Sequence, residues 1–235
     1  MKRSFVLILG ICGVILFLSN AYADVLYWSD YDLGSNPFPQ AITELGLNQE
    51  TAADVSDFNT KLAVDNYSLA ILFLQSNYYD ASQLSNLPDY LNNGGKVIFT
   101  DWTMDNTKSA WFGTTYTGAY NSDTVTLNAG FLTNGIGNTL NLTNPGWGTF
   151  SMDMALNGAT QGAFFADGGV AVAYTSNSII NGMLSDTFTD PAMGLQFAKN
   201  EIGYLQSVTV TPEPVSMLLF GVGGLTMAAL RKKKK

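Results

Sequence analysis

The run Leu69-Ala70-Ile71-Leu72-Phe73-Leu74 lies near the middle of the chain and carries an apolar side chain at every position. A strand with one face in water alternates apolar and polar residues, whereas this run does not alternate. We therefore predict a strand over residues 67–74 that is covered on both faces, as in a parallel sheet. Parallel strands need long crossover connections, which are usually helices.

Helical and strand patterns alternate on both sides of this strand. Before it, the patterns predict strands at 25–28 and 51–55 and helices at 38–47 and 58–64. After it, they predict a helix at 82–92, a turn at Asn93-Gly94-Gly95 and a buried strand at 96–100. This order predicts an α/β domain of three layers with a mostly parallel, flavodoxin-like sheet.

The second half of the chain departs from this alternation. Residues 106–165 are rich in Gly, Asn and Thr and predict a β insertion of short strands and turns. The α/β pattern resumes with strands expected at 171–174 and 178–184. A closing helix is expected at 193–205, with Leu195, Ala198, Ile202 and Leu205 facing inward.

The stretch from Asp89 to Phe99, which reads DYLNNGGKVIF, resembles the helix-Gly-Gly-strand unit of class I glutamine amidotransferase-like domains. The resemblance spans residues 25–105 and 170–207. It implies a nucleophilic cysteine after strand 96–100 and a partner histidine. This chain has Thr100-Asp101-Trp102 at that place, and it contains no histidine. The resemblance therefore implies the fold without the family's reaction.

The N-terminal residues 1–23 have the layout of a secretory signal peptide. Lys2 and Arg3 precede an apolar run over 5–18, and Ala21-Tyr22-Ala23 forms a small-x-small cleavage pattern. The alternative is an uncleaved anchor, but the run spans roughly 21 Å against a hydrocarbon core of roughly 30 Å. We expect export by the Sec machinery and cleavage by signal peptidase before Asp24.

The C-terminal residues 212–235 resemble the PEP-CTERM sorting signal of Gram-negative bacteria. Pro212-Glu213-Pro214 is followed by an uncharged apolar segment at 215–230, a single transmembrane helix in this interpretation, and by a basic tail at 231–235. The resemblance implies recognition of Pro212, Glu213 and Pro214 by exosortase. It implies an inner-membrane precursor that is later displayed on the cell surface or released. The alternative is a permanent tail anchor.

Residues 24–211 form the expected extracytoplasmic domain, and their composition excludes several functions. They carry eighteen acidic residues against four lysines and no arginine, so a nucleic-acid partner is not expected. The single cysteine, Cys12, lies in the predicted signal peptide, and the chain has no histidine. Catalysis and metal binding by thiolate or imidazole groups are therefore excluded for residues 24–211. No calcium loop is present, and we predict no metal, no cofactor and no catalytic residue.

Ligands of open α/β sheets bind outside the carboxyl ends of the strands. The residues expected at this edge are Asp30, Asp32, Asn77, Asp101, Trp102 and Asp105. One hypothesis is a non-catalytic binding or matrix module, with exopolysaccharide as its ligand. The alternative is a secreted polysaccharide hydrolase that uses Asp30 with Asp101 or Asp105 as its two carboxylates. These acids also fit solvated loop residues and helix caps.

Overall fold

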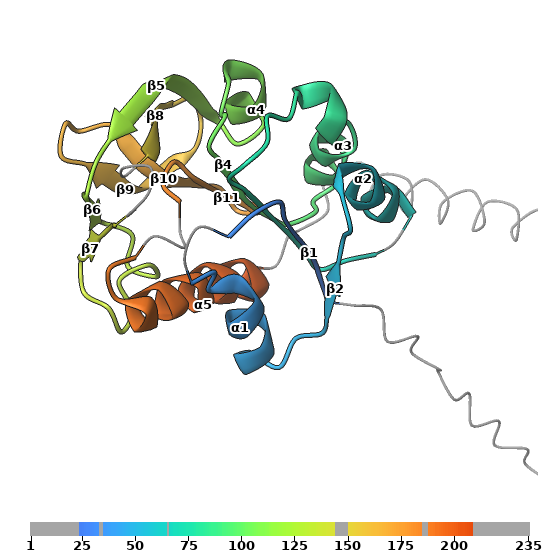
Figure 1. Cartoon of the computed structure of the whole chain (residues 1–235), viewed down its shortest axis with the longest axis horizontal. Coiled ribbons are helices and arrows are strands. Elements are labelled where there is room, and N and C mark those ends of the chain that lie inside the picture. Colours follow the sequence, from blue (N-terminus) through green and yellow to red (C-terminus); the bar gives the residue numbers. More distant parts are fainter. Residues whose placement is uncertain (1–23, 33–34, 65, 144–149, 185–187, 209–235) are drawn as a thin grey trace, which may run out of the picture.

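A computed structural model describes residues 24–32, 35–64, 66–143, 150–184 and 188–208 (Figure 1). The predicted signal peptide and the whole C-terminal segment 212–235 lie outside the described residues. None of the described helices is long and apolar enough to cross a membrane. Within the described residues, eleven strands join into one sheet.

The first part of the sheet is parallel. Its strands stand in the order β2-β1-β3-β4-β11. Their bounds are β1 Val25–Ser29, β2 Gln49–Thr51, β3 Leu69–Leu74, β4 Val97–Asp101 and β11 Ser178–Asn181. All six residues of β3 are fully buried, which confirms the strand expected from the unbroken apolar run. Its central place, with strands on both sides and helices on both faces, explains why no position of β3 is polar.

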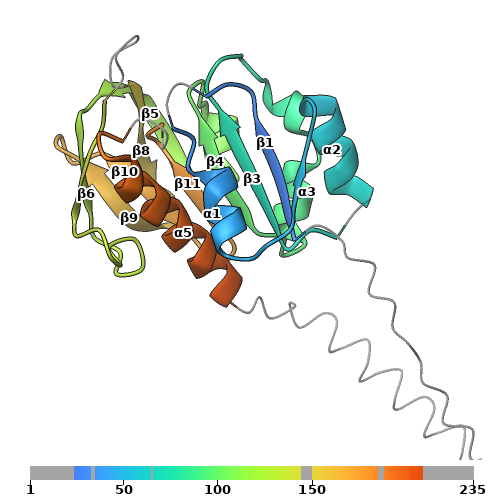
Figure 2. The same cartoon turned by 60° about the horizontal axis from the view of Figure 1, so that its bottom comes forward.

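Helices cover both faces of this parallel part, so the predicted three-layer arrangement is confirmed (Figure 2). One face packs against α1 (Phe38–Glu44) and α5 (Pro191–Ser207). The other face packs against α2 (Val55–Val64), the 3-10 helix η1 (Ala81–Leu84), α3 (Leu87–Asn92) and the region of α4 (Asn106–Ala110). Two apolar cores result, one on each side of the sheet.

The second part of the sheet is antiparallel, so the sheet is mixed rather than mostly parallel as predicted. From β11 the order continues β10-β9-β6-β7, and β8 joins β10 to β5. The bounds are β5 Thr114–Asn121, β6 Thr124–Leu127, β7 Thr139–Asn141, β8 Phe150–Leu156, β9 Thr160–Phe165 and β10 Val170–Tyr174. Three residues connect β10 to β11, and so short a connection joins only antiparallel neighbours.

Several predicted element bounds differ from the structure, and two of the differences have identifiable reasons. The strand expected at 51–55 ends at Thr51, because Asp54 caps α2 by accepting the N–H of Asp57 at 2.8 Å. The helix expected at 82–92 is divided into η1 and α3. Pro88 lies in the first turn of α3, where its missing N–H costs nothing, but it cannot continue a helix from Leu84.

The two ends of the described domain lie at the amino ends of the parallel strands. Asp24 directly precedes β1, and its carbonyl accepts the N–H of Ser68, just before β3, at 3.0 Å. At the other end, the carbonyl of Val208 accepts a hydrogen bond from Lys96 Nζ at 2.8 Å, just before β4. The carboxyl ends of the strands, where the ligand edge is expected, therefore lie at the opposite end of the sheet.

Candidate functional site at the carboxyl end of the sheet

The structure brings the predicted loops together, and Asp30 fastens two of them to each other. Its carboxylate accepts backbone N–H groups from Gln75 at 2.6 Å, Ser76 at 3.1 Å and Asn77 at 2.8 Å. Three consecutive amides thus converge on one carboxylate, which holds the loop after β3 in a defined shape. Asp30 has a structural task, and the amides that could bind an anion are already occupied.

Asp32 lies exposed on the same loop. Its Oδ1 accepts hydrogen bonds from the Ser29 hydroxyl at 2.8 Å and from the Asn36 amide at 2.6 Å. The Asn36 amide also donates to the Tyr27 hydroxyl, and its oxygen accepts the N–H of Phe38 at 3.1 Å. Asp32 therefore links Ser29 to Asn36, which lies shortly before α1, while its exposed position leaves it within reach of a ligand.

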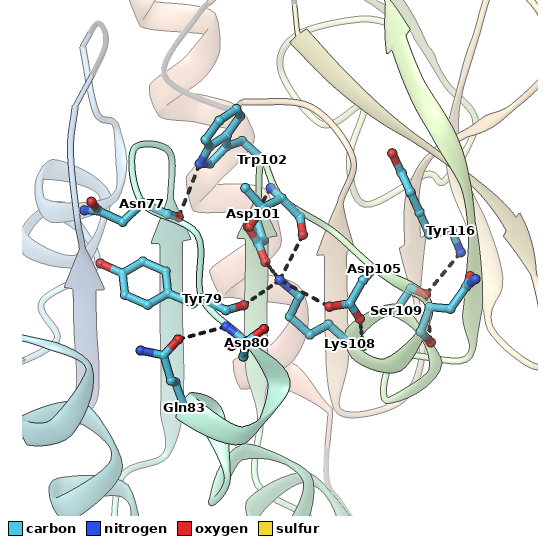
Figure 3. Close-up of polar contacts among 12 residues, drawn as sticks. Asn77, Tyr79, Asp80, Gln83, Asp101, Trp102, Asp105, Lys108, Ser109 and Tyr116 are labelled. Atoms are coloured by element: carbon cyan, nitrogen blue, oxygen red, sulfur yellow. Dashed lines mark hydrogen bonds and ion pairs between the residues drawn. The ribbon is translucent and has the colours of Figure 1, made fainter.

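Asp101 lies at the end of β4, where it is 1% exposed and paired with the fully buried Lys108 of α4. Lys108 Nζ also donates to the carbonyls of Tyr79 and Thr103, each at 2.9 Å (Figure 3). Burial raises the pKa of Asp101 above its usual range, and the charge and hydrogen bond of Lys108 oppose that rise. Solvent does not reach this pair, so Asp101 is closed to a substrate.

Asp105 serves as the N-terminal cap of α4. Its Oδ1 accepts the backbone N–H of Lys108 at 2.8 Å, and its Oδ2 lies 3.7 Å from Lys108 Nζ. The side chain is partly exposed. Asp105 therefore matches the helix-cap interpretation of the acids in the sequence, and it adds a second carboxylate to the surroundings of the buried ammonium.

Lys108 is the residue that organises this edge, and sequence reasoning missed it. Its ammonium ties β4 to the loop that follows β3, through Asp101 and the carbonyl of Tyr79. The available signal was its scarcity and spacing. It is one of four lysines in residues 24–211, and it follows Asp105 by three positions, which brings the two side chains together on a helix.

Three aromatic residues lie on the loops at this edge of the sheet, and we call Tyr31, Tyr78 and Trp102 the aromatic edge. Tyr31 is 51% exposed and Tyr78 is 61% exposed. The indole N–H of Trp102 donates to the carbonyl of Asn77 at 3.3 Å, so its partly buried ring stands beside the same loop. Lys108 Nζ lies 5.5 Å from the centre of the Tyr78 ring. Hydrogen bonding to Asp80 raises the pKa of Tyr78, so its hydroxyl stays neutral.

The site lacks the backbone of a nucleophile elbow. Such an elbow holds its nucleophile in a sharp, strained turn between a strand and a helix. Among the described residues, positive φ angles occur at glycines alone, so neither Asp101 nor Trp102 has one. Nor does the described part of the chain contain a group of three or more His, Cys, Asp or Glu side chains placed to hold a metal ion.

Comparison with known proteins identifies structures with a similar fold but no relative in sequence. No family model matches the chain, and no curated protein matches it. The N-terminal domain of mmIFT52 superposes with a TM-score of 0.56 at 11% identity, over 80% of this chain and 99% of that one. A protein described as a GMP synthase component, from Thermoplasma acidophilum, gives 0.53 at 13% identity, over 79% and 96% of the two chains.

A glutamine amidotransferase from Methylobacillus flagellatus gives a TM-score of 0.52 at 10% identity, over 82% of this chain and 97% of its own. At such identities the likeness concerns the fold alone. The domain has a glutamine amidotransferase-like, flavodoxin-like α/β fold, which confirms the resemblance drawn from Asp89 to Phe99. The sorting-signal resemblance of residues 212–235 stays a prediction.

Proposed function

We propose that this protein is an exported PEP-CTERM protein whose domain is a non-catalytic module that binds extracellular polysaccharide at the aromatic edge. The observation that carries the proposal is the buried Asp101–Lys108 pair beneath exposed Tyr78. The resemblance to amidotransferases implies a nucleophile after β4. At that place this chain has an ion pair that is buried from solvent, with the aromatic edge on the surface nearby.

The aromatic edge has the chemistry of a sugar-binding surface. Tyrosine offers a flat apolar ring with a polar tip, and such rings cover the apolar face of a sugar. The exposed side chains of Asn77 and Asp32 supply hydrogen-bonding groups beside the rings. The loop that carries Tyr78 is held by Asp30 at one side and by Lys108 at the other. A surface that is ordered before binding loses less entropy when the ligand arrives.

The export part of the proposal rests on the two terminal signals of the sequence. Sec export, signal peptidase cleavage before Asp24 and recognition of Pro212, Glu213 and Pro214 by exosortase would carry the domain from the inner membrane to the surface of a Gram-negative cell. The arrangement of the domain is compatible with this route. Both described ends lie opposite the aromatic edge, so attachment at either terminus leaves that edge open to a ligand.

No observation favours the two-carboxylate hydrolase. A hydrolytic pair must reach the glycosidic bond from both sides. Asp101 is buried beneath the loops, Asp30 accepts three backbone N–H groups, and Asp105 caps α4. We therefore keep polysaccharide as the ligand and leave turnover out of the proposal.

Binding is tested by replacing the more exposed ring. The mature protein should bind purified exopolysaccharide of its host in affinity electrophoresis, and Tyr78→Ala should weaken binding about tenfold, which corresponds to about 1.4 kcal/mol. Leu156→Ala is the control, because Leu156 is also exposed but lies on β8. Equal binding by Tyr78→Ala and the native protein, or release of shortened glycans, would overturn the proposal.

Sorting is tested by the intact mass of the protein recovered from each cell fraction. A surface or medium species that begins at Asp24 and ends near Pro212 supports exosortase processing. Glu213→Ala should keep the protein in the membrane fraction. A native species that retains Lys235 in the inner membrane would contradict the sorting part and leave the binding part standing.

A further inference from the structure

A cavity lies at the opposite end of the sheet, away from the aromatic edge. Its volume is about 530 Å³, within the usual range of small-molecule sites. It is formed where α2 and α3 end and where the chain enters β3 and β4. We call it the amino-end pocket and define it by Val64, Asn66, Asp89, Tyr90, Asn93 and Gly95.

Three polar side chains of this pocket are free to bind a ligand. In the part of the chain that the structure describes, the Asp89 carboxylate and the side-chain amides of Asn66 and Asn93 have no hydrogen-bond or ion-pair partner. They differ in this from Asp30, Asp101 and the other acids at the carboxyl end, which are engaged by neighbours. One carboxylate and two amides, all three exposed, thus line the cavity without a protein partner.

The walls of the pocket are held in place. The Tyr90 ring packs on the backbone of Gly95, where an added Cβ would lie 2.4 Å from the ring. Its hydroxyl donates to the carbonyl of Tyr67 at 3.0 Å. Val64 is 71% exposed and supplies an apolar surface at the rim. The pocket therefore combines a fixed wall, an apolar patch and open hydrogen-bonding groups, which is the composition of a site for a small polar molecule.

The charge of the pocket selects against anions. No lysine or arginine is among the described residues that line it. The nearby Lys61 is engaged by Glu50 and Asp57, and Lys96 donates to the carbonyl of Val208. The pocket also receives the C-terminal end of α2, which carries partial negative charge. A ligand with a positive charge and several hydroxyl donors complements these groups, whereas a phosphate or uronate meets repulsion.

We propose that the amino-end pocket binds an amino sugar, a saccharide residue that carries a protonated amine. The ammonium pairs with Asp89, the hydroxyls bond to the amides of Asn66 and Asn93, and an apolar sugar face covers Val64. This site is separate from the aromatic edge and does not depend on it. It gives the domain a charge-selective sugar site at the end where both described termini lie.

The experiment is calorimetric titration of the mature protein with three oligosaccharides of equal length. They are built of glucosamine, N-acetylglucosamine and galacturonate. Glucosamine oligomers should bind at least tenfold more tightly than the acetylated ones, and galacturonate oligomers should not bind. Asp89→Asn should weaken glucosamine binding about tenfold and leave binding of the acetylated oligomer unchanged.

Asp123→Asn controls for the acidity of the whole domain, because it removes one exposed carboxylate that lies far from the pocket in sequence and directly before β6. It should leave glucosamine binding as it is. Tyr78→Ala should also leave it as it is, so failure at the aromatic edge and failure at this pocket are distinguishable. Equal loss in Asp89→Asn and Asp123→Asn would show general charge attraction and overturn the proposal, as would equal affinity for galacturonate.

Discussion

Asp101 and Glu201 are two buried carboxyl groups on opposite faces of the same sheet. The unfavourable burial of a negative charge is offset in a different way for each of them. Asp101 lies on the face of α4 and pairs with Lys108. Glu201 lies on α5, and within the described residues neither of its oxygens has a hydrogen bond of good geometry. Burial raises the pKa of Glu201 to about 8, which its neighbour Asn181 only partly opposes. Glu201 is therefore mostly protonated at pH 7.

The comparison shows how one physical cost is met in two ways. Transfer of a carboxylate out of water is very unfavourable unless a partner compensates it or a proton neutralises it. On the α4 face the partner is an ammonium, and the pair also anchors the loops of the aromatic edge. On the α5 face a bound proton neutralises the carboxylate instead. The folding stability therefore depends on pH.

The largest effect is expected when the paired acid loses its partner. Lys108→Met leaves Asp101 as a buried carboxylate without a counter-charge, held only by the N–H and hydroxyl of Thr103. The carbonyls of Tyr79 and Thr103 also lose their donor. We expect a loss of about 3–5 kcal/mol in the free energy of unfolding. Urea denaturation followed by tryptophan fluorescence measures it.

The matched control for that variant removes both charges. Asp101→Leu combined with Lys108→Met should recover much of the loss, because no isolated charge remains in the core. It should stay below the native protein, because the two carbonyls remain without their donor. A single Lys108→Met variant as stable as the native protein would show that the pair is not needed, and the contrast with Glu201 would disappear.

An intermediate effect is expected on the pH dependence of stability. Glu201 keeps its proton in the folded state up to about pH 8, whereas the unfolded chain releases it near pH 4.5. Folding stability from this group is therefore complete below about pH 4.5 and is lost as the pH rises toward 8. The slope approaches about 1.4 kcal/mol per pH unit. Glu201→Gln should remove this slope in urea titrations between pH 5 and 8.

Glu44→Gln is the control for the α5 face, because Glu44 is exposed and its pKa is lowered by a hydrogen bond from Lys199. It should leave the slope between pH 5 and 8 in place. An equal slope in the native protein and Glu201→Gln would mean that Glu201 ionises freely in the folded state, so that both carboxylates are charged.

The smallest of the three effects is expected at Asp30, whose partners are backbone amides rather than a cation. Asp30→Asn keeps one acceptor oxygen but loses the charge and part of the three-amide contact. We expect a loss of about 1–2 kcal/mol. Hydrogen exchange of the Ser76 and Asn77 amides should accelerate, and unchanged exchange would argue against the fastening role of Asp30.

The parallel part of the fold could be predicted from the sequence, whereas the partners of the buried polar side chains could not. The all-apolar run of β3 and the Asn93-Gly94-Gly95 turn before β4 are local patterns with a direct physical meaning, and both were interpreted correctly. The break at Pro88 and the cap at Asp54 are also local, but they compete with helical and strand periodicity nearby. The antiparallel part was harder, because its short strands carry weak patterns and many Gly, Asn and Thr residues.

Six residues expected at the ligand edge do gather there, since parallel strands bring their carboxyl ends to one edge. The structural role of each residue could not be predicted from the sequence. Asp101 and Asp105 owe their tasks to Lys108, and Asp30 owes its task to amides more than forty positions away. The amino-end pocket was not predicted. Its residues come from the ends of two helices, and their composition is the same as that of ordinary loops.

The sequence by itself determined the fold class, the absence of histidine and thiol chemistry from residues 24–211, and the terminal patterns on which the export proposal rests. These follow from composition and from neighbours along the chain. The tertiary structure decided which acids are free, because a carboxylate's state depends on burial and on partners that folding brings from distant positions. Asp89 remains open, Asp101 is paired and Glu201 holds a proton, although all three are ordinary acids in the chain.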